Sequence, residues 1–97
     1  MIQLLRPAQA GTLESNDIMI TVAPGKAATG IVLELDSLVM AQYGEAIRQT
    51  IEETVAKQGV ADLYIKAIDR GALDCTIRAR LLAALARAGV IQQEAVV

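Results

Sequence analysis

The sequence of 97 residues contains no histidine, no tryptophan and no phenylalanine, and it has one cysteine, Cys75. Without histidine the chain cannot build a Ser-His-Asp or Cys-His nucleophilic system, and one cysteine can form neither an internal disulfide nor a cluster that holds zinc. The only Gly-Lys pair, Gly25-Lys26, is followed by Ala27, and Ile20 stands where a phosphate-binding loop needs its first glycine. We therefore expect no catalytic residues, no metal site, and a role other than that of a self-sufficient enzyme.

Strong charge of one sign and long apolar runs are also missing. The formal net charge is −2, which gives no attraction for nucleic acid or for an anionic membrane. No apolar run approaches the ~20 residues of a transmembrane helix, and the N-terminus lacks the basic start and apolar centre of a secretory signal. We expect a cytoplasmic protein that binds neither nucleic acid nor membranes.

Aliphatic residues are abundant, whereas aromatic ones are scarce. Hydrophobic residues make up 54% of the chain, and its only aromatic side chains belong to two tyrosines. A chain of this length fits one domain with a modest aliphatic core. Residues 1–16 contain Pro7 and Gly11 and show no sustained period, which indicates a mobile N-terminal arm. We therefore place a single α+β domain over residues 17–97.

Two strands are predicted directly after this arm. Apolar residues alternate with others over 18–23 and again over 31–36, a pattern that is typical of strands. The link between them contains Pro24, Gly25 and Gly30, residues that favour turns. The two strands are therefore expected to form a hairpin.

A helix is predicted next, because the period changes after the second strand. Apolar residues recur every four positions from Tyr43 to Val55, with charged residues on the other side. Asp36 or Ser37 can cap its first turn, and Gly59 can end it.

The C-terminal third contains one segment that fits two structures. A third strand is predicted over 61–68, followed by a tight turn in which Gly71 is free to adopt a positive φ. In the segment 72–80, apolar residues alternate as in a strand and also recur at helical spacing. We assign a strand as far as about Arg78, because its two β-branched residues favour it, and a helix from there to about Ala88, stopped by Gly89.

The predicted fold class is α+β, with the element order ββαββα. Two hairpins joined through a helix make a small two-layer sandwich, in which a four-stranded sheet carries both helices on one face. Cys75 falls in the alternating series and is expected to be buried and inert. Arg78 and Arg80 would share one face of the fourth strand, either as a solvated face or opposite an acidic partner or phosphate groups.

Two serines are candidates for a functional role, and Ser37 is the first. It belongs to the triplet Asp36-Ser37-Leu38 at a predicted helix start. Helical acyl carrier proteins hold phosphopantetheine on the serine of such a triplet, but this chain has strand alternation on both sides of it. Asp and Ser are also common at helix N-termini because their oxygens accept hydrogen bonds from free backbone N–H groups. We therefore interpret Ser37 as a capping residue.

Ser15 is the second candidate. It precedes the first predicted strand in a loop loosened by Gly11, so its hydroxyl should be exposed. Since the chain offers no base to activate it, another protein would have to carry out any chemistry there. The neighbouring Glu14 and Asp17 could attract a basic partner surface. The alternative is an ordinary turn in which Ser15, Asn16 or Asp17 binds the local backbone.

Two blocks of sequence resemble the acyl carrier subunit, or gamma chain, of citrate lyase. The first is AGTLESND at residues 10–17 with the strand that follows it, and the second is DRGALDC at residues 69–75 with the Ile-Arg-Ala-Arg run at residues 77–80. The segment LELDSLVMAQYGEAI between them is also similar. The resemblance therefore covers nearly the whole chain.

This resemblance implies that Ser15 carries a covalent prosthetic group, 2′-(5″-phosphoribosyl)-3′-dephospho-coenzyme A, in a phosphodiester link. It implies that the thiol of this phosphopantetheine-like arm bears an acetyl group. The citrate lyase alpha subunit would exchange acetate for citrate on that thioester, and the beta subunit, with a divalent metal, would release oxaloacetate. A prosthetic-group transferase and an acetylating ligase would load the arm. The chain itself would be a non-catalytic carrier.

Three alternatives stay open. The first is the carrier subunit of malonate decarboxylase, which uses the same kind of arm, although the GTLESND context argues against a glycine-flanked serine of that type. The second is a small α+β binding or assembly domain with no modification. The third keeps the carrier role and moves the arm to Ser37.

Overall fold

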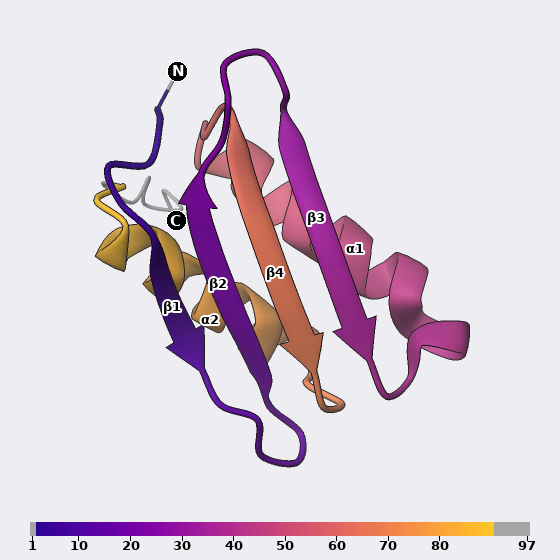
Figure 1. Ribbon diagram of the computed structural model, residues 1–97. Helices are drawn as coiled ribbons and strands as arrows, with labels where there is room; N and C mark the ends of the chain where they lie inside the picture. The colour runs from indigo at the N-terminus through magenta and orange to yellow at the C-terminus, as the bar shows by residue number, and fades with distance from the viewer. Residues whose placement is uncertain (1, 91–97) are drawn as a thin grey trace.

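A four-stranded sheet covered on one face by two helices makes up this protein, as described for residues 2–90 in the computed structural model (Figure 1). In chain order the elements are β1 (Ala8–Gly11), β2 (Ile18–Pro24), β3 (Ile31–Ser37), α1 (Met40–Lys57), β4 (Leu63–Asp69) and α2 (Asp74–Arg87). The α+β class, the four-stranded sheet and the two helices on one face are confirmed. The elements run βββαβα along the chain, whereas we expected ββαββα.

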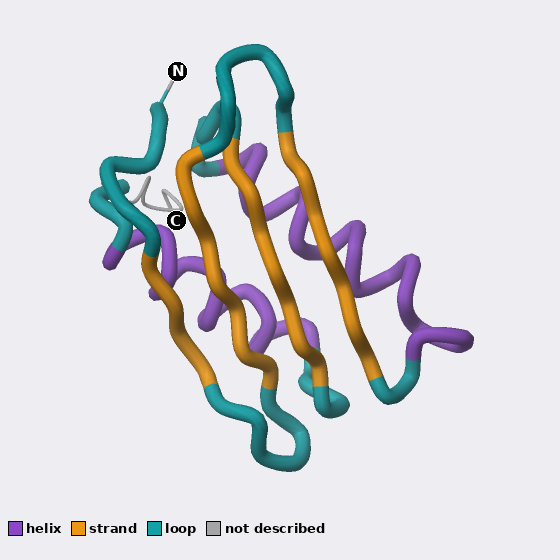
Figure 2. Tube along the Cα trace, in the orientation of Figure 1, coloured by secondary structure: helices purple, strands orange, loops and turns teal. Residues whose placement is uncertain are grey.

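The strands lie side by side in the order β1-β2-β4-β3 (Figure 2). β4 is antiparallel to β2 and parallel to β3, and α1 provides the crossover that a parallel pair requires. The hairpin expected between β2 and β3 is therefore wrong, because β4 lies between them. Their link passes over the start of β4, where the N–H groups of Gly25 and Gly30 donate to the Asp62 backbone oxygen at 3.1 Å and to its side-chain Oδ1 at 2.8 Å.

Residues 2–11, which we expected to precede the domain as a mobile arm, are part of the sheet and its core. β1 pairs antiparallel with β2, Ile2 forms a bridge with Val60, and the side chains of Leu4 and Ala10 are buried. The sequence of β1, AQAG, contains no β-branched or aromatic residue, so it carries no strand signal of its own. This edge strand forms because β2 offers it a partner.

The strand expected over 72–78 is also wrong, because α2 begins within that segment, at Asp74. Ile77, Leu81, Ala84 and Leu85 are fully buried along one stripe of α2, at the i, i+4, i+7, i+8 spacing of a core-facing helix. The β-branched residues near the start of this helix favoured a strand, but the packing of that stripe outweighs their local preference.

The core lies between the sheet and the helices and is aliphatic, as expected. Its larger side chains with no exposed surface come from β2, β4 and both helices: Ile18, Ile20, Val22, Ile51, Val55, Leu63, Ile65, Ile77, Leu81 and Leu85. Burying each one contributes roughly 1.5–3 kcal/mol relative to leaving it exposed. Ile18 follows directly after the loop that contains Ser15, so the C-terminal end of this loop is held by a fully buried core residue. No helix within residues 2–90 is long and apolar enough to cross a membrane.

Candidate functional site

Ser15 lies in the loop of the β1–β2 hairpin, residues 12–17, which we call the serine loop. The side chain of Ser15 is exposed, and its hydroxyl forms no hydrogen bond with any residue of the described chain. The turn closes through the Asp17 N–H, which donates to the Glu14 carbonyl at 3.2 Å, and Asn16 adopts a φ of +64°. Asparagine is one of the few residues that tolerate this left-handed conformation. The hydroxyl of Ser15 is therefore available to a second molecule.

Asp17 fixes the base of the serine loop. Its carboxylate accepts hydrogen bonds from the Thr12 hydroxyl at 2.6 Å and from the Ile18 N–H at 2.7 Å. The guanidinium of Arg80 on α2 donates to both carboxylate oxygens, from Nε at 3.0 Å and from Nη2 at 2.8 Å. These bonds, first those from Arg80 and then that from Thr12, hold the pKa of Asp17 well below its usual range. The same pair raises the pKa of Arg80.

The serine loop also pairs with the turn that follows β4. The Asn16 N–H donates to the Arg70 carbonyl at 2.8 Å, and the Arg70 N–H donates to the Asp17 carbonyl at 2.9 Å. The next residue, Gly71, adopts a φ of +91° and lies so close that a Cβ there would be 3.6 Å from Asn16 Oδ1. The loop is thus anchored to both β4 and α2 while its tip, at Ser15, stays free.

Ser37 occupies a different environment at the end of β3. Its side chain is half-buried, and its hydroxyl donates to Asp69 Oδ2 at 2.8 Å and accepts from the Val39 N–H at 3.1 Å. Asp69 is only 1% exposed, and its carboxylate also accepts the backbone N–H groups of Gly71 at 3.2 Å and Ala72 at 2.9 Å. A group attached to Ser37 would remove the proton that this hydroxyl donates to a buried carboxylate. The environment of Ser37 therefore indicates a structural role.

The helix cap expected from Asp36 or Ser37 is wrong in its position. α1 begins at Met40, its N-cap residue is Val39, and no side chain of the described residues makes a capping hydrogen bond there. The end of the helix agrees with the sequence, since Gly59 follows the last turn with a φ of +68°.

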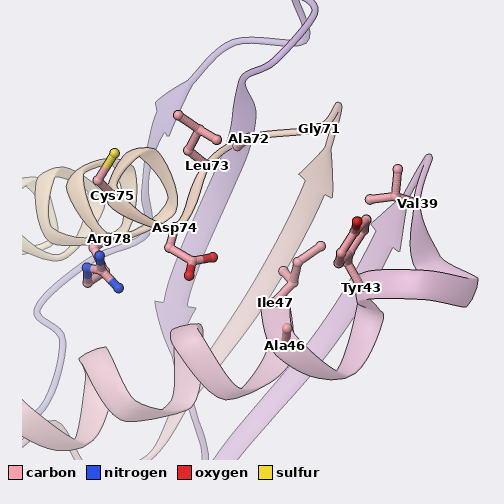
Figure 3. Close-up of a pocket in the computed structure, with 10 residues that line it drawn as sticks. All are labelled: Val39, Tyr43, Ala46, Ile47, Gly71, Ala72, Leu73, Asp74, Cys75 and Arg78. Carbon is pink, nitrogen blue, oxygen red and sulfur yellow. The ribbon is translucent and has the colours of Figure 1, made fainter.

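A pocket of about 600 Å³ lies between the first turns of α1 and α2, beside the turn after β4 (Figure 3). Its lining comes mainly from apolar side chains of α1 and of the turn, and it includes Tyr43, Asp74 and Arg78. Gly71 lines it as well, so the pocket begins where the serine loop touches the turn. We call it the α1–α2 pocket.

The sequence is similar to the citrate lyase acyl carrier protein of Streptococcus uberis, with 50% identity over 92 residues, which cover 95% of this chain and 89% of the relative. The chain belongs to the citrate lyase acyl carrier protein family. Citrate lyase acyl carrier protein 2 of Salmonella typhimurium is 48% identical over 87 residues, covering 90% of this chain and 89% of the relative.

The family model for the Malonate decarboxylase delta subunit (MdcD) matches residues 5–88 of this citrate lyase acyl carrier protein family member. Among solved structures, a chain of a Pseudomonas malonate decarboxylase hetero-tetramer, determined in complex with malonate, has the same fold. The TM-score is 0.72 at 20% identity, over 91% of this chain and 93% of that chain. At this level of identity the likeness shows that the two chains share a fold.

Sequence reasoning missed two features of this acyl carrier family member. Arg80 was expected beside Arg78 on a strand, whereas both lie on α2 and only Arg80 reaches Asp17. No local pattern links residues 63 positions apart, so this ion pair was not predictable from the sequence. Cys75 was expected to be buried, but it is exposed in the first turn of α2 and lines the α1–α2 pocket.

Proposed function

We propose that this chain is the acyl carrier subunit of a citrate lyase and that Ser15 carries 2′-(5″-phosphoribosyl)-3′-dephospho-coenzyme A in a phosphodiester link. When bound, this group supplies a terminal thiol that holds the acyl group as a thioester. The partners in this proposal are the alpha and beta subunits of citrate lyase, the prosthetic-group transferase and the acetylating ligase. The cytoplasmic location expected from the sequence stays a prediction.

The observation that carries the choice of Ser15 is its free hydroxyl on a firmly held loop. The four hydrogen bonds of Asp17 fix the base of the loop, so an attached group would have a defined origin on the surface. No described side chain bonds the Ser15 hydroxyl, so the transferase has to supply the base that removes its proton. Ser37, in contrast, is engaged by Asp69.

The residues beside the serine loop fit a phosphodiester. Arg70 is joined to the loop by two backbone hydrogen bonds, and its side-chain Nε is buried without a hydrogen-bond partner among the described residues. A buried N–H without an acceptor is uncommon in folded proteins. A phosphate oxygen is a strong acceptor for a guanidinium, so Arg70 is the residue we expect to contact the link at Ser15. In this account the chain binds and orients the arm and performs no bond-making step itself.

A second candidate function is that of the acyl carrier subunit of a malonate decarboxylase. It is favoured by the family model that matches residues 5–88 and by the shared fold with a chain of the Pseudomonas malonate decarboxylase. Citrate lyase is the better proposal because the relatives at about half identity over most of both chains carry that name.

Reconstitution with purified catalytic subunits tests the proposal. The chain, loaded by the transferase and ligase, is mixed with citrate lyase alpha and beta subunits, and oxaloacetate is measured after citrate is added. We expect turnover with the wild type and none with Ser15→Ala, while both have the same circular dichroism spectrum. Turnover by Ser15→Ala would favour the unmodified binding or assembly domain. Activity only with malonate decarboxylase subunits and malonate would favour the second candidate.

A further inference from the structure

The α1–α2 pocket has no role in the proposed attachment at Ser15, yet it lies next to that residue. Gly71 lines the pocket and adjoins Asn16, the neighbour of Ser15 in the chain. The Asn16 N–H, which belongs to the peptide bond after Ser15, donates at 2.8 Å to the Arg70 carbonyl, which belongs to the peptide bond before Gly71. Any group attached to Ser15 starts beside this pocket.

The pocket's lining combines an aromatic ring, aliphatic walls and two opposite charges. Figure 3 shows the side chains of Tyr43, Ile47 and Asp74 turned toward the space between the two helices, with Arg78 one turn further along α2. Tyr43 and Leu73 are 55% and 69% exposed. Apolar side chains of this size are normally covered when they gather around a concavity. A planar, partly apolar group with polar edges suits this lining.

We propose that the α1–α2 pocket binds the adenine nucleoside portion of the arm, folded back against the domain. This inference rests on the proposed function and deepens it. The adenine ring stacks on Tyr43 against the aliphatic wall, as bases stack on aromatic side chains in single-stranded nucleic-acid sites. Its exocyclic amine donates to the Asp74 carboxylate, and Arg78 contacts the diphosphate. The ligand class is an adenosine diphosphate derivative.

The geometry favours the nucleoside over the pantetheine end of the arm. Only the phosphoribosyl unit separates the adenosine from the link at Ser15, whereas the pantetheine lies at the far end of the arm, beyond the diphosphate. A base held near its attachment point leaves the pantetheine and its thiol free to reach other subunits. A pocket filled by the thiol end would instead hide the acyl group from them. Anchoring the base shortens the arm's free length and so raises the effective concentration of its thiol near the docked partner.

Titration of the unmodified chain tests the pocket without any attachment. Isotope-labelled protein is titrated with ADP, with dephospho-coenzyme A and with pantetheine, and backbone amide shifts are followed by NMR. We expect ADP and dephospho-coenzyme A, but not pantetheine, to shift residues 39–47 and 71–78. Tyr43→Ala should raise the Kd for ADP roughly tenfold, the loss expected from one stacked base. Tyr43→Phe keeps the ring and should bind like the wild type.

Tyr64→Ala is the matched control, because Tyr64 is the other tyrosine of the chain and does not line the pocket. It should leave the Kd for ADP unchanged. Shifts caused by pantetheine alone would overturn the proposal, since the pocket would then take the thiol end. The proposal would also be overturned by two results together: ADP shifts no residue of the pocket, and the amide shifts of the pocket are the same in the loaded protein and in the unmodified chain.

Measurements on the loaded protein distinguish a failure of this inference from a failure of the proposed function. If mass spectrometry finds no adduct on Ser15, the proposed function fails, while the ADP titration still decides whether the pocket binds a nucleotide. If the adduct is present, the adenine protons should show the broad lines of the folded domain and the pantetheine methyl groups the narrow lines of a mobile chain. Equally narrow lines for both would contradict the binding of the adenine in the pocket.

Discussion

The two serines should respond in opposite ways to replacement by alanine. The Ser37 hydroxyl donates at 2.8 Å to the carboxylate of Asp69, which is 1% exposed and keeps two backbone N–H donors in the variant. A hydrogen bond to a charged group contributes about 1.5–3 kcal/mol, and Ser37 is only half-buried, so Ser37→Ala should lower the free energy of unfolding by about 1–2 kcal/mol. In a domain of this size the melting temperature falls by roughly 5–15 °C.

Ser15→Ala should change the free energy of unfolding by less than about 0.5 kcal/mol, because the exposed hydroxyl makes no hydrogen bond within the described chain. Loading by the transferase should nevertheless fall to zero in this variant and stay complete in Ser37→Ala. Thermal melts followed by circular dichroism measure the first quantity, and intact mass after incubation with the transferase measures the second. A Ser37→Ala protein that melts like the wild type but cannot be loaded would refute the reasoning for both residues.

Three further predictions concern the serine loop, the end of β1 before it and the start of α2. The folded-state pKa of Asp17 is depressed, so its ion pair stabilises the protein above the unfolded-state pKa of about 3.9. This stability is lost as the pH falls below that value. Thermal melts from pH 7 to pH 2.5 should therefore show a steeper fall in melting temperature for the wild type than for Asp17→Asn. Gly11→Ala should destabilise strongly, beyond the roughly 1–3 kcal/mol of a strained backbone, since its Cβ would lie 1.8 Å from the Ile18 carbonyl oxygen. Urea unfolding should show a smaller loss for the control Gly59→Ala, where nothing lies within 4 Å, and equal losses would contradict the clash. The exposed thiol of Cys75 should react with a thiol reagent in the native protein about as fast as in urea; protection until unfolding would show that it is buried.

Local patterns were sufficient for the elements whose apolar residues face a core. The strand alternation before Pro24, the four-residue period of α1 and the positive φ of Gly71 were all predicted and are confirmed. These features depend on the side chains of one segment, so the segment alone reveals them.

Features that depend on a distant partner were not predictable. The sequence of β1 has no strand signal, and this strand forms only because β2 pairs with it. The sequences of β2 and β3 do not indicate that β4 lies between them. The sequence of the first turns of α2 fits the period of a strand and that of a helix equally well. Only packing of the helix against the sheet favours one of them. In the candidate site, Ser15 and its exposure followed from the sequence, whereas its support by Arg80 depended on the tertiary fold.

The most direct test of the proposed carrier role is an intact mass, with fragmentation, of the protein produced together with its modification enzymes. We predict one adduct with the mass of the phosphoribosyl-dephospho-coenzyme A group, located on Ser15. The same adduct on Ser37 would contradict the choice of site. No adduct, when both enzymes modify a control carrier, would contradict the carrier role itself.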